Sequence, residues 1–284
     1  MIVSIHQPHY LPWLGLLEKI ALSDRFVVFD TVAYNRASFQ HRALYSTDAG
    51  AKYLSLSVRH KGEHGTLAAI ELAKHGVPSK HFKTLEQRYG KRPGWGLVAP
   101  WLAQILCSPP ARLLDINLRT LVITMRLLGV QTEVVLASQL EPLPDGWKRI
   151  VPKTDPKSHL VIATALTAGG DVYLSGLGAK TYLDTRPFRA AHMRLVWQRF
   201  IHPGYDQSHE GQFQKGCFAL EWLIEDPHAP SKFAEHVARA RVRLDLPPAS
   251  PSRTTAVTDR DNSSPAALEA YSSTAAPVLA QKID

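Results

Sequence analysis

Two imidazoles, an amide, a phenol and an indole lie within eight residues near the start of the chain. They are the side chains of His6, Gln7, His9, Tyr10 and Trp13, with Pro8 and Pro12 between them. Because histidine titrates near neutral pH, His6 and His9 are candidate catalytic residues, as acid–base groups or phosphate ligands. Gln7, Tyr10 and Trp13 would then bind substrate. The alternative is a proline-shaped turn with aromatic rings packed beneath it, but the density of polar groups favours a site.

The spacing His-X-X-His does not by itself predict a metal site. Zinc needs third and fourth ligands, and the sequence shows no further cluster to provide them, so we predict no metal. The two cysteines, Cys107 and Cys217, form neither a disulfide framework nor a zinc pattern. We interpret Cys217 as a core thiol, and the alternative is a nucleophile that carries an acyl group.

The elements around this segment are those that place a ligand site at the edge of a sheet. A β-branched run over 2–5 precedes it, and apolar residues recur at helical spacing over 14–22. Open α/β sheets bind ligands beyond the carboxyl ends of strands in such strand–loop–helix units. The run 25–30 predicts a second buried strand that ends in Asp30. We predict Asp30 as a catalytic residue, and the alternative is a turn or capping aspartate.

A second strand-end loop is predicted to bind phosphate. A helix over 160–166 and a strand over 172–174 lead into the candidate residues Ser175, Gly176, Gly178 and Lys180. Glycine lets backbone amides approach an anion, and lysine adds a positive charge. The spacing is not that of a Walker loop. The alternative is a simple turn with a solvated lysine.

Two further polar–aromatic loops supply candidate substrate-binding residues. These are Tyr34 and Arg42 in the first loop, and His202, Tyr205 and Gln207 in the second. The alternative for the second loop is an ordered connector, and its residues alone favour that interpretation over a binding role.

The remaining pattern predicts an open, mainly parallel Rossmann-like α/β sheet flanked by helices. We expect helices over 79–89, 100–106, 113–128 and 218–224, and strands over 53–58, 131–136 and 194–200. Gly129 would end the long helix 113–128 as its C-terminal cap. We expect one domain over 1–246. A tail rich in Pro, Ser, Ala and Thr, 247–284, is predicted to be disordered.

Composition narrows the class of protein. The 284 residues are 45% hydrophobic and 20% charged, which is ordinary for a globular chain. The net charge of +8 fits anionic partners such as nucleotides or sugar phosphates, and equally a protein that is simply basic. No apolar stretch reaches the ~18 residues that span a bilayer, and no secretory signal is evident. We expect a cytoplasmic protein with neither membrane nor nucleic acid as partner.

The motifs together resemble those of the WbqC-like family. The resemblance rests on segments 6–13, 173–184 and 202–207, on Asp30 with Tyr34, and on Phe39 with Arg42, in order from residue 2 to about 227. That family is associated with gene clusters for O-antigen and other cell-surface polysaccharides. The resemblance implies transfer of an amino acid, glycine, to a sugar. Three positions depart from the family pattern, where Ala33, Phe218 and Glu221 replace Gln, Ser and Asp.

A weaker resemblance is to α/β enzymes of the nucleotidyltransferase and pantothenate-synthetase type. Those enzymes bind ATP with a histidine pair at the end of the first strand. By that analogy His6 and His9 would stabilise a transferring phosphate and Lys180 would clamp it. The His-X-Gly-His form usual in those enzymes is absent here, so the analogy concerns the fold.

We therefore predict a transferase that moves an acyl or aminoacyl group onto a sugar or related metabolite in polysaccharide or natural-product biosynthesis. One alternative is an ATP-dependent ligase that forms an acyl-adenylate. Another is a non-catalytic module that binds a nucleotide-sugar or a carrier protein. The partners expected are a small-molecule donor, a sugar-like acceptor and, in one version, an acyl or aminoacyl carrier protein. The sequence leaves the cofactor open between ATP and a nucleotide-activated donor.

Overall fold

Five parallel strands form the centre of the protein. The computed structural model describes residues 1–59, 66–73, 78–141, 143, 155–207 and 211–248. The strands are β1 (Ile2–His6), β2 (Arg25–Val28), β7 (Glu133–Leu136), β8 (Val172–Gly176) and β9 (Arg194–Gln198), in the spatial order β7-β2-β1-β8-β9. The predicted open, Rossmann-like α/β sheet is confirmed.

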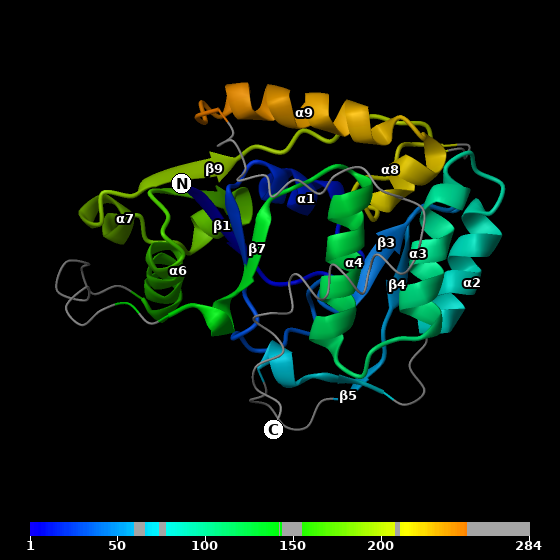
Figure 1. Ribbon diagram of the computed structural model, residues 1–284, viewed down its shortest axis with the longest axis horizontal. Helices are drawn as coiled ribbons and strands as arrows, with labels where there is room; N and C mark the ends of the chain where they lie inside the picture. The colour runs from blue at the N-terminus through cyan, green and yellow to red at the C-terminus, as the bar shows by residue number, and fades with distance from the viewer. Residues whose placement is uncertain (60–65, 74–77, 142, 144–154, 208–210, 249–284) are drawn as a thin grey trace, which may run out of the picture.

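Helices cover both faces of this sheet because side chains alternate along each strand. Val3 and Ile5 of β1 pack against α6 (Pro156–Thr167) and α7 (Arg186–Ala190). Ile2, on the other face, packs with α9 (Ala229–Arg243) and the end of α1 (Leu14–Ala21). Figure 1 shows α6 and α7 together on one side of the sheet, α4 (Leu113–Leu127) on the other, and α9 across the top.

The largest core extends from the sheet into a lobe of helices and hairpins. It joins α1 and α4 to α2 (Pro78–Tyr89), α3 (Trp95–Cys107) and α8 (Leu220–Glu225). Two antiparallel pairs lie beside these helices: β3 (Arg42–Tyr45) with β4 (Lys52–Ser55), and β5 (Val58–Arg59) with β6 (Glu71–Leu72). Three short 3₁₀ helices complete the described elements: η1 (Leu67–Ala69), η2 (Ala137–Gln139) and η3 (Leu177–Thr181).

The structure can be compared element by element with the expectations from the sequence. The helix 113–128 is α4, and Gly129 follows it with φ 73°, the left-handed conformation of a C-terminal cap. The loop that begins at Ser175 starts two residues later than predicted, since β8 runs to Gly176 before η3. The pattern did not predict α9, because its buried side chains include one large apolar group, Phe233. The predicted tail lies, from residue 249, outside the described residues.

The strand order changes direction between β1 and β8. From β1 the chain proceeds to β2 and β7 on one side, whereas β8 and β9 are added on the other. Such a reversal is the usual position of ligands in open α/β sheets. β1 pairs with β2 up to His6–Val28, but its pairing with β8 ends at Val3–Tyr173. Beyond these pairs the carboxyl ends of β1 and β8 are not paired with each other, and we call this place in the sheet the switch-point crevice.

Candidate functional site

His6 ends β1 beside the switch-point crevice. Its Nδ1 lies 2.9 Å from the carbonyl oxygen of Gln7, which can only accept, so Nδ1 carries the proton. Burial lowers the pKa of His6 well below its usual value. The positive charge of Lys19 and the nearby His9 ring lower it further. No described residue bonds its Nε2. His6 is therefore a neutral imidazole at pH 7 with an unprotonated, unpartnered nitrogen.

His9 lies against His6, with ring centroids 4.7 Å apart and an angle of 79° between the rings. Its side chain is 9% exposed, and its Nδ1 is buried with no hydrogen-bond partner in the described structure. Burial and the charge of Lys19 lower the pKa of His9 to about 3. The structure thus places the two predicted histidines side by side.

Lys19 is a functional candidate that the sequence analysis missed. It lies on α1, is 3% exposed, and its Nζ donates to the carbonyl of Ile5 at 3.1 Å. The His6 carbonyl accepts from Phe29 after β2, so the Ile5 carbonyl faces the opposite neighbour, β8. The Lys19 ammonium thus bonds a carbonyl that faces the crevice. The available signal was a lysine that follows a glutamate inside a helix whose other residues are apolar, Leu14–Ala21.

The other polar and aromatic side chains of the 6–13 loop contact neighbouring segments and hold the loop in position. Gln7 Oε1 accepts from Gln40 Nε2 at 2.8 Å. The Tyr10 hydroxyl is buried and hydrogen-bonded to His81 Nδ1 of α2 at 2.9 Å. Trp13 lies edge-on to Phe200 at 5.2 Å at the start of α1. Tyr10 and Trp13 both pack in the main core, so the structure gives them a supporting position.

Asp30 lies beyond the end of β2 with both carboxylate oxygens occupied. Oδ1 accepts from the Ser138 backbone N–H at 3.0 Å and Oδ2 from the Ser138 hydroxyl at 2.6 Å. These bonds join the end of β2 to η2, which follows β7. The geometry is that of a capping aspartate, the alternative that the sequence left open, and its catalytic role stays a prediction.

The Ser175–Lys180 segment follows the strand across the crevice from β1. Ser175 is buried at the end of β8, and Gly176 and Gly178 have open space where a side chain would be. Lys180 is exposed and lies 5.4 Å from the centroid of the Trp197 ring, a cation–π distance. The two predicted loops thus follow neighbouring strands, and the Lys180 ammonium lies against β9.

Arg42 connects to the histidine pair through an aromatic ring. Its guanidinium carbon lies 5.8 Å from the Phe39 centroid and 4.6 Å from that of Tyr53, and Phe39 lies 5.6 Å from His9. Arg42 Nε is buried without a partner among the described residues. Tyr34, by contrast, contacts His41 at 5.8 Å. His6, His9, Phe39 and Arg42 therefore form one continuous strip.

His202, Tyr205 and Gln207 belong to a separate region around Glu221 of α8. Gln207 Nε2 donates to Glu221 Oε1 at 2.9 Å, and the Tyr205 hydroxyl lies 3.4 Å from the same oxygen. His202 packs edge-on to Phe213 at 5.0 Å. Cys217 is buried here, and burial together with Glu221 raises its thiol pKa, which opposes a nucleophilic role.

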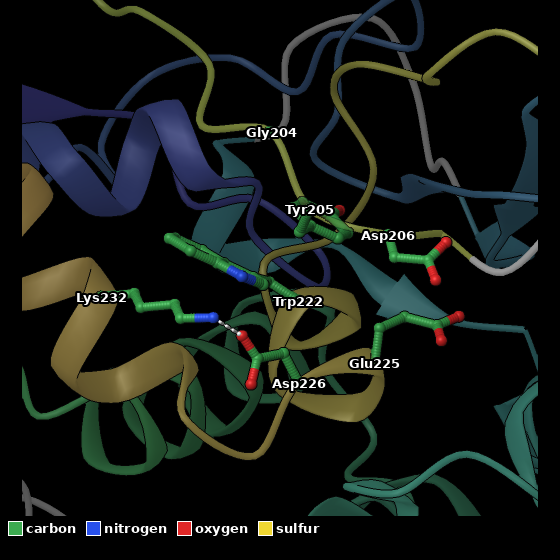
Figure 2. Close-up of a pocket in the computed structure, with 7 residues that line it drawn as sticks. All are labelled: Gly204, Tyr205, Asp206, Trp222, Glu225, Asp226 and Lys232. Atoms are coloured by element: carbon green, nitrogen blue, oxygen red, sulfur yellow. Dashed lines mark hydrogen bonds and ion pairs between the residues drawn. The ribbon is translucent and has the colours of Figure 1, made fainter.

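A cavity of about 290 Å³ lies at the edge of this region, lined by Gly204, Tyr205, Asp206, Trp222, Glu225, Asp226 and Lys232. Figure 2 shows the Lys232 ammonium directed at the Asp226 carboxylate, and the two lie 2.6 Å apart. Glu225 lies 3.6 Å from Arg92, and Tyr205 stacks on Trp222 at 5.7 Å. Because these charges and rings pair with each other, the cavity is a weaker candidate than the crevice.

In the described part of the chain, no three His, Cys, Asp or Glu side chains gather closely enough to hold a metal ion. None of the described helices has the length and apolar character needed to cross a membrane.

Comparison with known proteins identifies the family. A family model described as the WbqC-like protein family matches residues 7–227. This chain belongs to that family. A relative is the uncharacterized protein Rv1507c of Mycobacterium tuberculosis (strain ATCC 25618 / H37Rv), 29% identical over 226 residues, or 78% of this chain and 92% of the relative. No solved structure gives a significant match to this WbqC-like chain.

Proposed function

We propose that this WbqC-like protein transfers an acyl or aminoacyl group from an activated donor to a hydroxyl or amine of a sugar or related metabolite. The state of His6 carries the proposal. Its Nδ1–H is fixed on the Gln7 carbonyl, its lowered pKa keeps the ring neutral, and its Nε2 has no partner among the described residues. An unprotonated imidazole nitrogen at a strand-order reversal is what a general base requires.

In the proposed reaction, His6 Nε2 takes the proton of the acceptor as the acceptor oxygen or nitrogen attacks the acyl carbon. The bond between that carbon and the leaving group of the donor then breaks. The leaving group departs with the proton that His6 returns. The acceptor gains the acyl group and loses a proton, and the leaving group of the donor gains that proton. No oxidant or reductant is needed.

The lowered pKa of His6 makes the free imidazole a weak base, and a bound donor would correct this. Lys19 is a cause of the lowering, because its positive charge disfavours a second one nearby. A negatively charged donor at the crevice would offset that charge and raise the pKa of His6. The base would therefore strengthen when the donor binds.

Glycine and basic residues are available for such a donor. Gly176 and Gly178 follow β8 with open space around them, and Lys180 is exposed beside Trp197 of β9. Arg42 lies on the far side of Phe39 from His9. The two positive charges favour donors with a phosphate or a nucleotide. Acyl phosphates, acyl-adenylates and phosphopantetheine thioesters, including those on a carrier protein, share this chemistry.

The test is acyl transfer by the purified chain. Acetyl phosphate, acetyl coenzyme A, or ATP with glycine is supplied together with glucosamine, and mass spectrometry detects the acylated sugar. We expect product with one of these donors, and His6→Gln should reduce turnover by about 10²–10⁴-fold. His228→Gln, which changes an exposed histidine before α9, is the matched control and should retain activity.

The outcomes separate the alternatives. Pyrophosphate exchange that depends on glycine would favour the ATP-dependent ligase. Salt-sensitive binding of a nucleotide-sugar with no product from any donor would favour a binding module. Full turnover by His6→Gln would exclude His6 as the base.

A further inference from the structure

We propose that Lys19, together with His6 and His9, forms an oxyanion-binding subsite at the switch-point crevice, and that this subsite holds the phosphate or carboxylate group of the substrate. The inference deepens the proposed transferase function and rests on it for the identity of that substrate. Lys19 lies outside every motif found in the sequence.

The first observation is the position of the Lys19 charge. Lys19 is 3% exposed, and a buried ammonium is normally matched by a carboxylate, because burial of a lone charge is costly. No ion pair of Lys19 occurs in the part of the chain that the structure describes. Its hydrogen bond to the Ile5 carbonyl uses one of three N–H donors. Burial lowers the pKa of Lys19 to about 7, so below that pH the subsite has positive charge without a matching anion among the described residues.

The neighbouring residue on α1 shows the contrast. Glu18 is also fully buried, but its carboxylate is matched by His236 at 2.7 Å and Arg243 at 3.6 Å, and it accepts from Gln198 at 3.0 Å. These partners come from the end of β9 and from α9. The chain thus neutralises one buried charge of the pair and leaves the other for a ligand.

The second observation is the unpartnered nitrogen of His9. His9 Nδ1 is buried in a side chain that is 9% exposed, and no described group bonds it. Buried polar atoms almost always have a partner, and an orphan at a candidate site indicates a missing one. A negatively charged oxygen would accept from this nitrogen when it carries the proton.

The third observation is the interrupted sheet. The Ile5 carbonyl would accept from β8 if the two strands stayed paired, but pairing ends at Val3–Tyr173 and the Lys19 ammonium takes that place. The backbone and the charge are thus arranged around the crevice. His6 and His9 lie in contact with each other there, and the positive charge of Lys19 adds to the effect of burial in lowering the pKa of both.

The experiment measures binding of simple anions, without turnover. Melting temperature is recorded with inorganic phosphate, pyrophosphate and acetate, each against sodium chloride at equal ionic strength. We expect phosphate or pyrophosphate to stabilise the wild-type chain and the Lys80→Met control, which changes an exposed lysine of α2. Stabilisation should be lost in Lys19→Met. An equal or larger effect of acetate would assign the subsite to carboxylates.

A second measurement separates an electrostatic role from a structural one. Removal of the Lys19 charge should raise the pKa of both His6 and His9, measured by NMR titration of the imidazole nitrogens. Lys19→Gln keeps a donor for the Ile5 carbonyl without the charge, and should show the same loss of phosphate binding if Lys19→Met folds poorly. Unchanged phosphate binding in both Lys19 variants, or no effect of any anion on the wild type, would overturn the subsite.

The two proposals fail in distinguishable ways. Phosphate binding that depends on Lys19, together with full turnover in His6→Gln, would retain the subsite and reject the base. Turnover that depends on His6, together with anion binding that is unchanged in the Lys19 variants, would retain His6 as the base and reject the subsite.

Discussion

His6 and Tyr10 lie four residues apart in one loop, yet the structure gives them different positions. His6 lies at the crevice with an unpartnered Nε2, whereas the Tyr10 ring is 1% exposed and its hydroxyl is bonded to His81. Both side chains combine polar and apolar character, so residue type alone does not separate them. What separates them is whether another side chain already satisfies the polar atom.

Tyr10→Phe tests this division at the level of a single atom. Loss of the hydroxyl removes a buried hydrogen bond and leaves His81 Nδ1 without its partner, so the free energy of unfolding should fall by about 1–3 kcal/mol. Turnover should stay near the wild-type value at a temperature where both proteins are folded. Urea denaturation measures the free energy of unfolding, and the transfer assay measures turnover. A selective loss of turnover with unchanged stability would return Tyr10 to the substrate site.

At the scale of elements, α9 is held on the sheet by the buried carboxylate of α1. Glu18 contacts His236 and Arg243 of α9 and also Gln198 at the end of β9. These contacts fix α1, which carries Lys19 on its next residue. A stable α9 therefore contributes to the position of the crevice lysine.

Glu18→Ala should lower the free energy of unfolding by about 3–5 kcal/mol, because it leaves buried polar partners unpaired. Glu235→Ala is the control on α9: it removes an exposed pairing with Arg239 and should change stability by at most about 0.5 kcal/mol. Chemical denaturation of both variants measures the difference. Similar effects of the two substitutions would show that the Glu18 network does not anchor α9.

At the scale of the whole molecule, buried basic groups predict how stability depends on pH. Burial lowers the pKa of His9 to about 3 and of His81 to about 4, and it also lowers that of His6. In the unfolded chain these groups titrate near 6.5, so between about pH 4 and 6.5 the unfolded state binds more protons. The histidines therefore favour folding above pH 6.5, and this stability is lost as pH falls below it.

Lys19 acts in the same direction at higher pH. Burial lowers its pKa from 10.5 to about 7, so from pH 7 upward the unfolded state again binds more protons. The melting temperature should rise from pH 4.5 to 6.5 and again from pH 7 to 9. In Lys19→Met the rise above pH 7 should be reduced. A melting temperature that is higher at pH 5 than at pH 8 would contradict this assignment.

The sequence by itself determined the elements and the loops that matter. The β-branched run before the 6–13 loop, the apolar period of α1 and the second strand ending near Asp30 predicted a β–α–β unit, because these signals are local. The motifs at 6–13, 173–184 and 202–207 also indicated the family to which the chain belongs. Strand order was beyond this reading, since pairing depends on contacts between distant segments.

Only the tertiary structure decided which polar side chains remain available to a ligand. It bonded Asp30 to Ser138, Tyr10 to His81 and Gln207 to Glu221, three partnerships that join residues far apart in sequence or in separate elements. It also placed the Lys19 ammonium on the carbonyl of Ile5, the residue before His6, where the pairing of β1 with β8 has ended. A motif shows which chemical groups are present, whereas their partners, burial and charge depend on packing across the whole chain.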